Sequence, residues 1–158
     1  MQKLRVGIIG AGRIGQVHAK SITYHIPQAE IVAISDLFPE NAQKVADDLG
    51  IPKAVQDYHE ILNDPTVDAV LICSSTDTHA DIAVEAAKAG KDIWCEKPMT
   101  RTIGEGKRVV EAVRQNGRIF RLNTWFRFKD TFYGLGTTVE PLKKLVDSGL
   151  LGWPLKGT

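Results

Sequence analysis

Three glycines near the N-terminus have a spacing that suits phosphate binding. Gly10, Gly12 and Gly15 form the pattern G-x-G-x-x-G within GIIGAGRIG. The pattern follows a predicted strand and opens a predicted helix, which is the context in which it binds a dinucleotide. The first glycine permits a tight turn, the second lets the backbone approach a pyrophosphate, and the third lets helix and strand pack closely. Free amides at the helix start, those of Arg13 and Ile14 included, then hold the phosphates.

An acidic residue, Asp36, follows 21 residues after Gly15, at the end of the second predicted strand. A carboxylate there accepts hydrogen bonds from the adenosine ribose hydroxyls and repels a 2′-phosphate. The next residues, Leu37, Phe38 and Pro39, supply no basic group for that phosphate. The pattern therefore favours NAD over NADP. Two structural alternatives stay open: the glycines only turn the chain from strand to helix, and Asp36 is a helix N-cap, which is compatible with a ribose contact.

Two polar segments follow later strands, CSSTDTH (73–79) and CEKP (95–98). Ligands of open parallel sheets bind beyond the carboxyl ends of the strands, so both segments are expected to face the same crevice as Gly12. Ser74, Ser75 and Thr76 are expected to border the cofactor, although turn formation alone would also explain them. His79 is a candidate for contact with substrate or cofactor, and the alternative is a polar surface residue.

A lone acid and a lone base, Glu96 and Lys97, directly follow the short apolar run Ile93 to Cys95. Transfer of a hydride from a secondary alcohol requires its hydroxyl to lose a proton, so the site needs a proton acceptor or a cation beside the developing alkoxide. An ammonium group stabilises that charge directly. We therefore expect an electrostatic or relay role for Lys97 rather than that of primary base. The structural alternative is a surface Glu-Lys pair that ends a strand.

Alternating strand-like and helix-like segments predict the scaffold for these residues. Apolar runs alternate with amphipathic stretches, which is typical of a parallel sheet with crossover helices. The fold class is α/β, a Rossmann-type doubly wound parallel sheet with helices on both faces. Main strands are expected at 4–10, 30–35, 68–75, 91–95 and 118–126, helices at 13–24, 39–49 and 79–89, a minor strand and short helix within 53–64, and a further helix from the Thr102/Glu105 capping box to Gly117.

Composition excludes several classes of protein. The 158 residues suffice for one domain with a core, and 43% hydrophobic and 25% charged residues are ordinary for a soluble chain. With 20 basic and 19 acidic residues, there is no net field for nucleic acid or an anionic membrane. Cys73 and Cys95 lie in apolar runs without metal-ligand spacing, which predicts reduced core thiols and no metal. Without a signal peptide or membrane-length apolar stretch, we expect a cytoplasmic protein.

The combination of these motifs resembles one family. The glycine pattern, Asp36, the block SSTDTHADIAVEAAKAGKDIWCEKP and a later RF followed by SGLLGWP are similar to the N-terminal half of the Gfo/Idh/MocA family of oxidoreductases. The resemblance covers nearly the whole chain. It implies an NAD(P)-dependent oxidoreductase acting on a sugar, cyclitol or related polyol. It further implies that Lys97 is the catalytic-site lysine, that Glu96 lies near the nicotinamide ribose, and that Lys97–Pro98 is a cis peptide.

The resemblance also shapes the expected domain organisation. Family members continue into a second α/β domain that completes the substrate site, whereas this sequence ends at Thr158. We therefore interpret residues 1–123 as the NAD(P)-binding domain and 124–158 as an interdomain segment leading into a substrate domain that is absent or truncated. Such a fragment alone is expected to be inactive, and the full-length protein to be a homo-oligomer, mainly through the missing domain. The alternative function is a non-catalytic dinucleotide-binding regulator or sensor, which needs the glycines and Asp36 but no Lys97.

Overall fold

The computed structural model describes residues 2–124 and residue 148. The chain separates into two units, Met1–Asn123 and Thr124–Thr158, and every element below belongs to the first. The sequence also predicts a short amphipathic helix in VEPLKKLVDSG and places two aromatic residues, Phe132 and Tyr133, before it. Apart from Ser148, these segments and the pair Arg127 and Phe128 lie outside the described residues. The roles predicted for residues 124–158 stay predictions.

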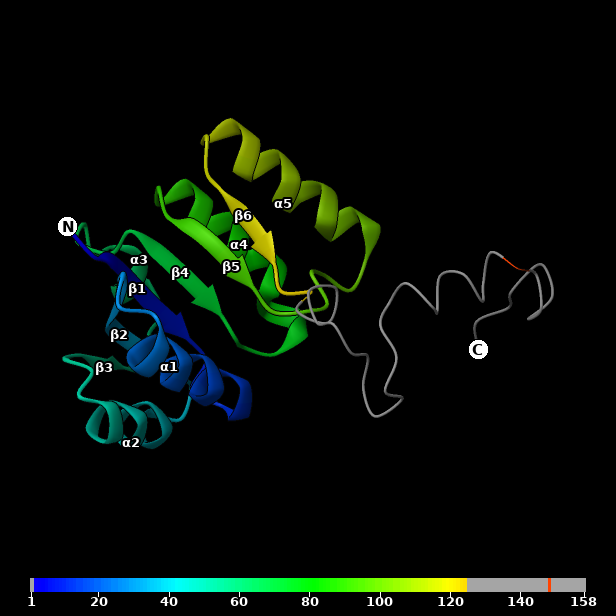
Figure 1. Cartoon of the computed structure of the whole chain (residues 1–158). Helices are drawn as coiled ribbons and strands as arrows, with labels where there is room; N and C mark the ends of the chain where they lie inside the picture. Colours follow the sequence, from blue (N-terminus) through cyan, green and yellow to red (C-terminus); the bar gives the residue numbers. More distant parts are fainter. Residues whose placement is uncertain (1, 125–147, 149–158) are drawn as a thin grey trace. The chain divides into compact units, whose positions relative to one another are not determined.

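Strands and helices alternate along the first unit, as Figure 1 shows. In chain order the elements are β1 (Leu4–Ile9), α1 (Arg13–His25), β2 (Ala29–Ser35), α2 (Pro39–Leu49), β3 (Ala54–Val55), α3 (His59–Leu62), β4 (Ala69–Ile72), the 3-10 turn η1 (Thr76–Thr78), α4 (His79–Lys88), β5 (Asp92–Cys95), α5 (Ile103–Gln115) and β6 (Phe120–Leu122). The predicted alternation, the minor strand and the short helix are confirmed.

The six strands form one parallel sheet in the order β3-β2-β1-β4-β5-β6. The strand order reverses between β1 and β4, which is the switch point where doubly wound sheets bind their ligands. The predicted fold class is therefore confirmed. The sixth strand is shorter than predicted at both ends, since it ends at Leu122 and the described Asn123 and Thr124 are not in a strand. It starts late because the Arg118 amide bonds to the Val113 carbonyl in the last turns of α5 and the Ile119 amide to the Asp92 carboxylate.

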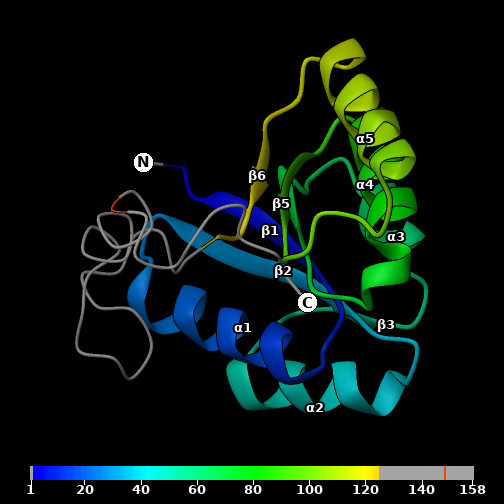
Figure 2. The same ribbon diagram turned by 90° about the vertical axis from the view of Figure 1, so that its right-hand side faces the viewer.

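Helices cover both faces of the sheet. Figure 2 shows α1 and α2 on one side and α3, α4 and α5 on the other. Two buried clusters match these layers. One packs Ala19, Ala42 and Val45 of α1 and α2 with Ile8 of the sheet, and the other packs helices α3 to α5 with the opposite face of the strands. Because both faces are covered, the central strands read as continuous apolar runs.

Several local predictions are also confirmed. Thr102 and Glu105 form a capping box at the start of α5, with the Thr102 hydroxyl 3.1 Å from the Glu105 amide and the Glu105 carboxylate 3.2 Å from the Thr102 amide. Gly50 ends α2 in the left-handed conformation, at φ 69°. Cys73 and Cys95 are free and buried. Within the described residues, no helix has the length and hydropathy needed to cross a membrane.

Candidate functional site

The three glycines of the loop between β1 and α1 serve three different purposes. Gly10 has φ +104°, and a Cβ there would lie 2.6 Å from the carbonyl carbon and oxygen of Cys73. A Cβ at Gly15 would overlap the Gly10 carbonyl oxygen. Gly12 has an ordinary φ of −67°, and a Cβ would meet nothing within 4 Å. Gly10 and Gly15 are thus required by the fold, whereas Gly12 leaves open space that a ligand can enter.

The start of α1 beside Gly12 has the properties of an anion site. Gly12 is the N-cap, and among the described residues no side chain caps this end and no acidic residue lies in its first turn. The first amides of a helix, here those of Arg13, Ile14 and Gly15, have no partner within the helix and carry the positive end of its dipole. A phosphate that enters the space beside Gly12 would meet these amides. The residues present therefore fit the pyrophosphate of a dinucleotide.

Asp36 follows β2 and contacts the glycine loop directly. Its Oδ2 accepts a hydrogen bond from the Ala11 amide at 2.7 Å, and its Oδ1 accepts from the Phe38 amide at 3.0 Å. The alternative reading of Asp36 as the N-cap of α2 is wrong, because Phe38 holds that position and Asp36 lies two residues before it. The carboxylate therefore stands where the glycine loop and the end of β2 meet, which is where the fingerprint requires a ribose ligand.

A cleft of about 830 Å³ opens at this carboxyl edge of the sheet. Five of the predicted site residues line it, namely Gly10, Gly12, Asp36, Ser74 and Ser75. Ser35 also lines the cleft. Its hydroxyl is buried and has no hydrogen-bond partner among the described residues. Arg13, Ile14, Gly15, Thr76, His79, Glu96 and Lys97 do not line this cleft. A hollow of similar size, about 800 Å³, runs along α5 but contains none of the glycine-loop residues.

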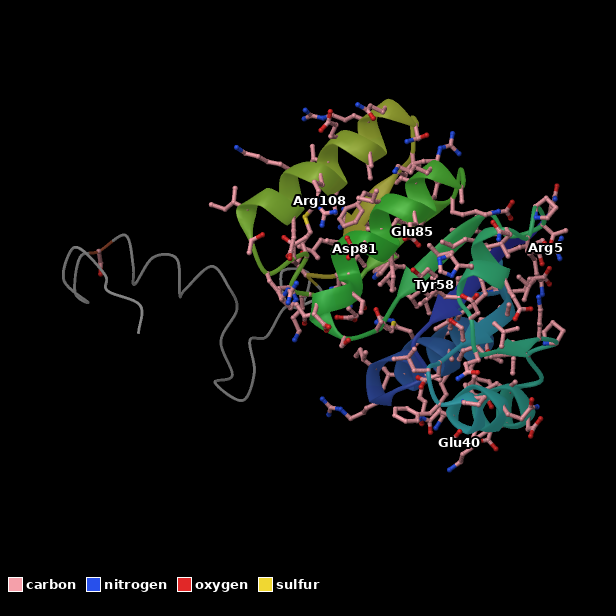
Figure 3. All side chains as sticks on the ribbon, turned by 180° about the vertical axis from the view of Figure 1, so that it is seen from behind. Arg5, Glu40, Tyr58, Asp81, Glu85 and Arg108 are labelled. Atoms are coloured by element: carbon pink, nitrogen blue, oxygen red, sulfur yellow. The ribbon has the colours of Figure 1, made fainter. Side chains whose placement is uncertain are left out.

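The wall of the cleft beyond Asp36 is acidic. Asp77, Asp81 and Glu85 line it together with Asp36, and its described lining contains no lysine or arginine. Figure 3 shows Tyr58, Asp81 and Glu85 with Arg108 of α5 nearby. Asp81 pairs with Arg108 at 3.0 Å, and Glu85 accepts from the Tyr58 hydroxyl at 2.7 Å. Burial and the Glu85 carboxylate raise the pKa of Tyr58, so the Tyr58 hydroxyl stays protonated and donates.

His79 is buried at the start of α4, with 2% of its surface exposed. Its Nδ1 lies 2.8 Å from the Pro98 carbonyl oxygen and its Nε2 lies 3.0 Å from the Ser74 carbonyl oxygen. The alternative reading as polar surface is therefore wrong. His79 joins the loop after β4 to the loop after β5. Its predicted contact with cofactor stays a prediction.

Glu96 is also buried, with 5% of its surface exposed. Its Oε1 accepts from His18 Nε2 at 2.6 Å and from Asn123 Nδ2 at 2.5 Å, and its Oε2 accepts from the Lys97 amide at 3.1 Å. Burial raises the pKa of Glu96, but these hydrogen bonds outweigh burial and lower the pKa below its ordinary value. The carboxylate is therefore ionised at neutral pH, and the alternative reading as a surface Glu-Lys pair is wrong.

Lys97 is exposed and directly follows this anchored carboxylate. The Lys97–Pro98 peptide is cis, as the family resemblance implied. Because β5 is parallel to its neighbours, Lys97 lies at the same edge of the sheet as the glycine loop and Asp36. The predicted position of Glu96 near a nicotinamide ribose stays a prediction, and the contacts observed for its carboxylate are with His18, Asn123 and the Lys97 amide.

Sequence reasoning missed two residues of this site, His18 and Asn123. His18 falls among the apolar positions of α1, and Asn123 stands directly after β6. The available signal for His18 was a polar side chain among the apolar positions of its helix, whereas Asn123 follows a segment that also contains Arg118 and Arg121 and gave no such signal. The described residues contain no cluster of three or more side chains suited to a metal ion.

Comparison with known proteins agrees with this geometry. Residues 4–124 match the family model of the Gfo/Idh/MocA oxidoreductases, NAD-binding Rossmann fold. The chain is 37% identical over 151 residues to a myo-inositol 2-dehydrogenase of Thermotoga maritima, covering 96% of this chain and 43% of that protein. It is 35% identical over 153 residues to the scyllo-inositol 2-dehydrogenase (NAD(+)) of Bacillus subtilis, covering 97% and 43%.

A solved structure is similar over the same region. The scyllo-inositol dehydrogenase of Lactobacillus casei, crystallised with NAD(H) and scyllo-inositol, superposes with a TM-score of 0.79 at 28% identity, covering 96% of this chain and 43% of that one. The chain thus spans less than half the length of the relatives it matches. It belongs to the Gfo/Idh/MocA family of oxidoreductases, and its residues 4–124 are the NAD-binding Rossmann fold of that family.

Proposed function

We propose that the chain is the cofactor-binding domain of an NAD-dependent oxidoreductase acting on a secondary alcohol of a sugar, cyclitol or related polyol. The observation that carries the proposal is the carboxyl edge of the sheet, where the open loop at Gly12, the Asp36 carboxylate and Lys97 follow β1, β2 and β5. Relatives named as inositol dehydrogenases make a cyclitol the first substrate class to test.

The cofactor is proposed to be NAD rather than NADP. A 2′-phosphate would add about two negative charges beside Asp36. The remaining wall adds Asp77 and Glu85, and Asp81 in its pair with Arg108, and its described lining offers no lysine or arginine to the phosphate. Like charges at short range cost binding free energy, so an acidic wall disfavours NADP.

Lys97 is proposed to act on the substrate side of the reaction. The nicotinamide, when bound, supplies the acceptor or donor of the hydride. The Lys97 ammonium would stabilise the oxygen that develops negative charge as its proton leaves, or pass that proton on. Glu96 does not neutralise the ammonium by direct pairing, because its carboxylate is turned inward to His18 and Asn123.

The 158 residues alone are proposed to bind NAD without turning over substrate. Hydride transfer requires the reacting carbon to be held about 3–3.5 Å from the nicotinamide, and loss of such positioning removes about 7–11 kcal/mol of assistance. The groups that hold substrate would come from a second domain, since the matched relatives are more than twice as long.

The test compares this chain with a longer chain that continues past Thr158. Each is assayed on a panel of cyclitols and sugars by NADH absorbance, and NAD binding is measured in parallel by calorimetry. We expect both to bind NAD and only the longer chain to reduce it. Comparable turnover by the short chain would contradict the two-domain proposal, and NAD binding without turnover by either chain would favour a regulator or sensor.

A further inference from the structure

We propose that His18 and His79 are positioning residues that hold Lys97 from both sides. The proposal rests on the function proposed above, in which Lys97 lies beside the nicotinamide. Lys97 itself is exposed, while its neighbours in the chain, Glu96 and Pro98, are each bonded to a histidine of a different helix.

The first anchor is His18, on the helix that the glycine loop opens. His18 lies six residues after Gly12 and donates to the Glu96 carboxylate at 2.6 Å. The same carboxylate accepts from Asn123 at 2.5 Å and from the Lys97 amide at 3.1 Å. Only 6% of the Glu96 side chain is exposed, so water competes little for these bonds. A single buried carboxylate therefore fastens the Lys97 backbone to α1 and to the end of β6.

The second anchor is His79, the first residue of α4. Its two ring nitrogens lie within 3.0 Å of the Pro98 and Ser74 carbonyl oxygens. Ser74 lines the dinucleotide cleft, so this contact ties the cleft wall to the residue after Lys97. Neither histidine lines the cleft itself, and both act through the loop they hold.

The two anchors fix the backbone from which the long, flexible Lys97 side chain extends. Lysine has many rotamers, so an ammonium group can be aimed at a reacting atom only when its own backbone is fixed. Misplacement by about 1 Å at a reacting centre can cost about 100-fold in rate. The glycine loop precedes α1, and the loop of Ser74 to Thr76 precedes α4. The two anchors therefore also fix the distance of each of these loops from Lys97.

The experiment uses two ligands that differ at the nicotinamide end. Wild type, His18→Leu, His79→Leu and the donor-keeping variants His18→Gln and His79→Gln are titrated with NADH and with ADP-ribose, which lacks the nicotinamide. His25→Leu, an exposed histidine at the end of the same helix α1, is the matched control. The fold of each variant is checked by circular dichroism.

We expect each leucine variant to weaken NADH binding by about tenfold, because a displaced Lys97 loses its own contact at the nicotinamide end, the equivalent of one hydrogen bond to a charged group, while ADP-ribose affinity changes less than twofold. The glutamine variants are expected to recover most of the loss, and His25→Leu to change nothing. Equal losses for both ligands would show that the histidines only support the fold, and unchanged NADH binding would show that they do not position Lys97. Either result overturns the proposal.

A second variant covers the case in which leucine prevents folding. Glu96→Gln keeps the shape of the side chain but removes the charge that holds His18 and Asn123. It is expected to lower NADH affinity and to spare ADP-ribose, and any other pattern overturns the proposal. If the wild type bound neither ligand, the proposed function itself would be contradicted. This result differs from those that overturn only the positioning role of the histidines.

Discussion

The glycine loop and the Lys97 loop lie at the same edge of one sheet but are built in different ways. The glycine loop is made by backbone: Gly10 and Gly15 allow a turn so close that neither tolerates a Cβ, and Asp36 bonds to the Ala11 amide. The Lys97 loop is held by buried or half-buried side chains that come from α1, α4 and the end of β6. The first region thus depends on local sequence, and the second on long-range polar contacts.

This difference explains what each region demands of its residues. At the glycine loop a substitution acts through steric overlap, so its effect depends on which glycine is changed. At the Lys97 loop a substitution acts by leaving a buried polar group without its partner, which costs about 1–3 kcal/mol for each such group.

The largest effect is expected at Lys97. In a catalytically complete chain, Lys97→Ala should lower kcat by about 100- to 10,000-fold, the usual contribution of a positioned acid, base or charge. NADH affinity should fall by about tenfold, as in the histidine variants, while ADP-ribose affinity should change less than twofold, because the phosphates and adenosine are bound elsewhere. Steady-state kinetics with a cyclitol, combined with titration of NADH and ADP-ribose, measures these quantities. An unimpaired Lys97→Ala enzyme would remove the role given to this residue.

The glycines provide the next test. Gly10→Ala should lower the free energy of unfolding by about 2–4 kcal/mol, because a positive φ and an overlap with the Cys73 backbone both oppose the methyl group. Gly12→Ala should change it by less than about 0.5 kcal/mol, since its φ is ordinary and its Cβ site is open. Urea unfolding of both variants measures the contrast, which equal effects would contradict.

Cofactor choice should depend on few side chains at the glycine-loop end. Replacing Asp36 by Ser and Leu37 by Arg should shift the affinity ratio toward NADP by about tenfold or more, since a like-charge contact is removed and a cation is added. Titration of wild type and variant with both cofactors gives the ratio. A wild type that already binds NADP as tightly as NAD would show that Asp36 is misread.

The smallest effect concerns acid stability. The pKa of Glu96 is lowered in the fold, so its contribution to stability is present above the unfolded pKa of about 4.3 and is lost as the pH falls through the lower folded pKa. Glu96→Gln should therefore destabilise the chain more at pH 7 than at pH 3.

Urea unfolding across this pH range measures the difference, with Glu111→Gln on the exposed face of α5 as the control. A destabilisation by Glu96→Gln that is the same at both pH values would mean that the Glu96 charge does not stabilise the fold.

Much of the fold could be predicted because its signals are local. The predicted bounds of β1, α1, β2 and α2 differ from the observed ones by no more than one residue, and the capping box was visible in the sequence. The sixth strand was predicted too long at both ends, and at its start this is because the early residues look β-like but bond to α5 and to Asp92. The pattern of apolar residues predicts a preference for strand, but it does not predict the hydrogen-bond partner of each backbone amide.

The candidate site divides in the same way. The glycines and Asp36 were recognisable from spacing within one strand-helix-strand unit. The bond from His18 to Glu96 joins residues 78 apart in sequence, and the one from Asn123 joins residues 27 apart. No periodicity encodes such a contact. Only the folded arrangement shows that His18 is a hydrogen-bond partner of the buried Glu96 carboxylate.

The central claim is that NAD binds at the open loop beside Gly12, and calorimetric titration of wild type and Gly12→Val with NAD tests it most directly. Valine finds no neighbour within 4 Å at its Cβ, so the variant should fold, while the added side chain would occupy the space proposed for the pyrophosphate. We expect one-to-one binding by the wild type and none by the folded variant. Unaltered NAD affinity in folded Gly12→Val would contradict it.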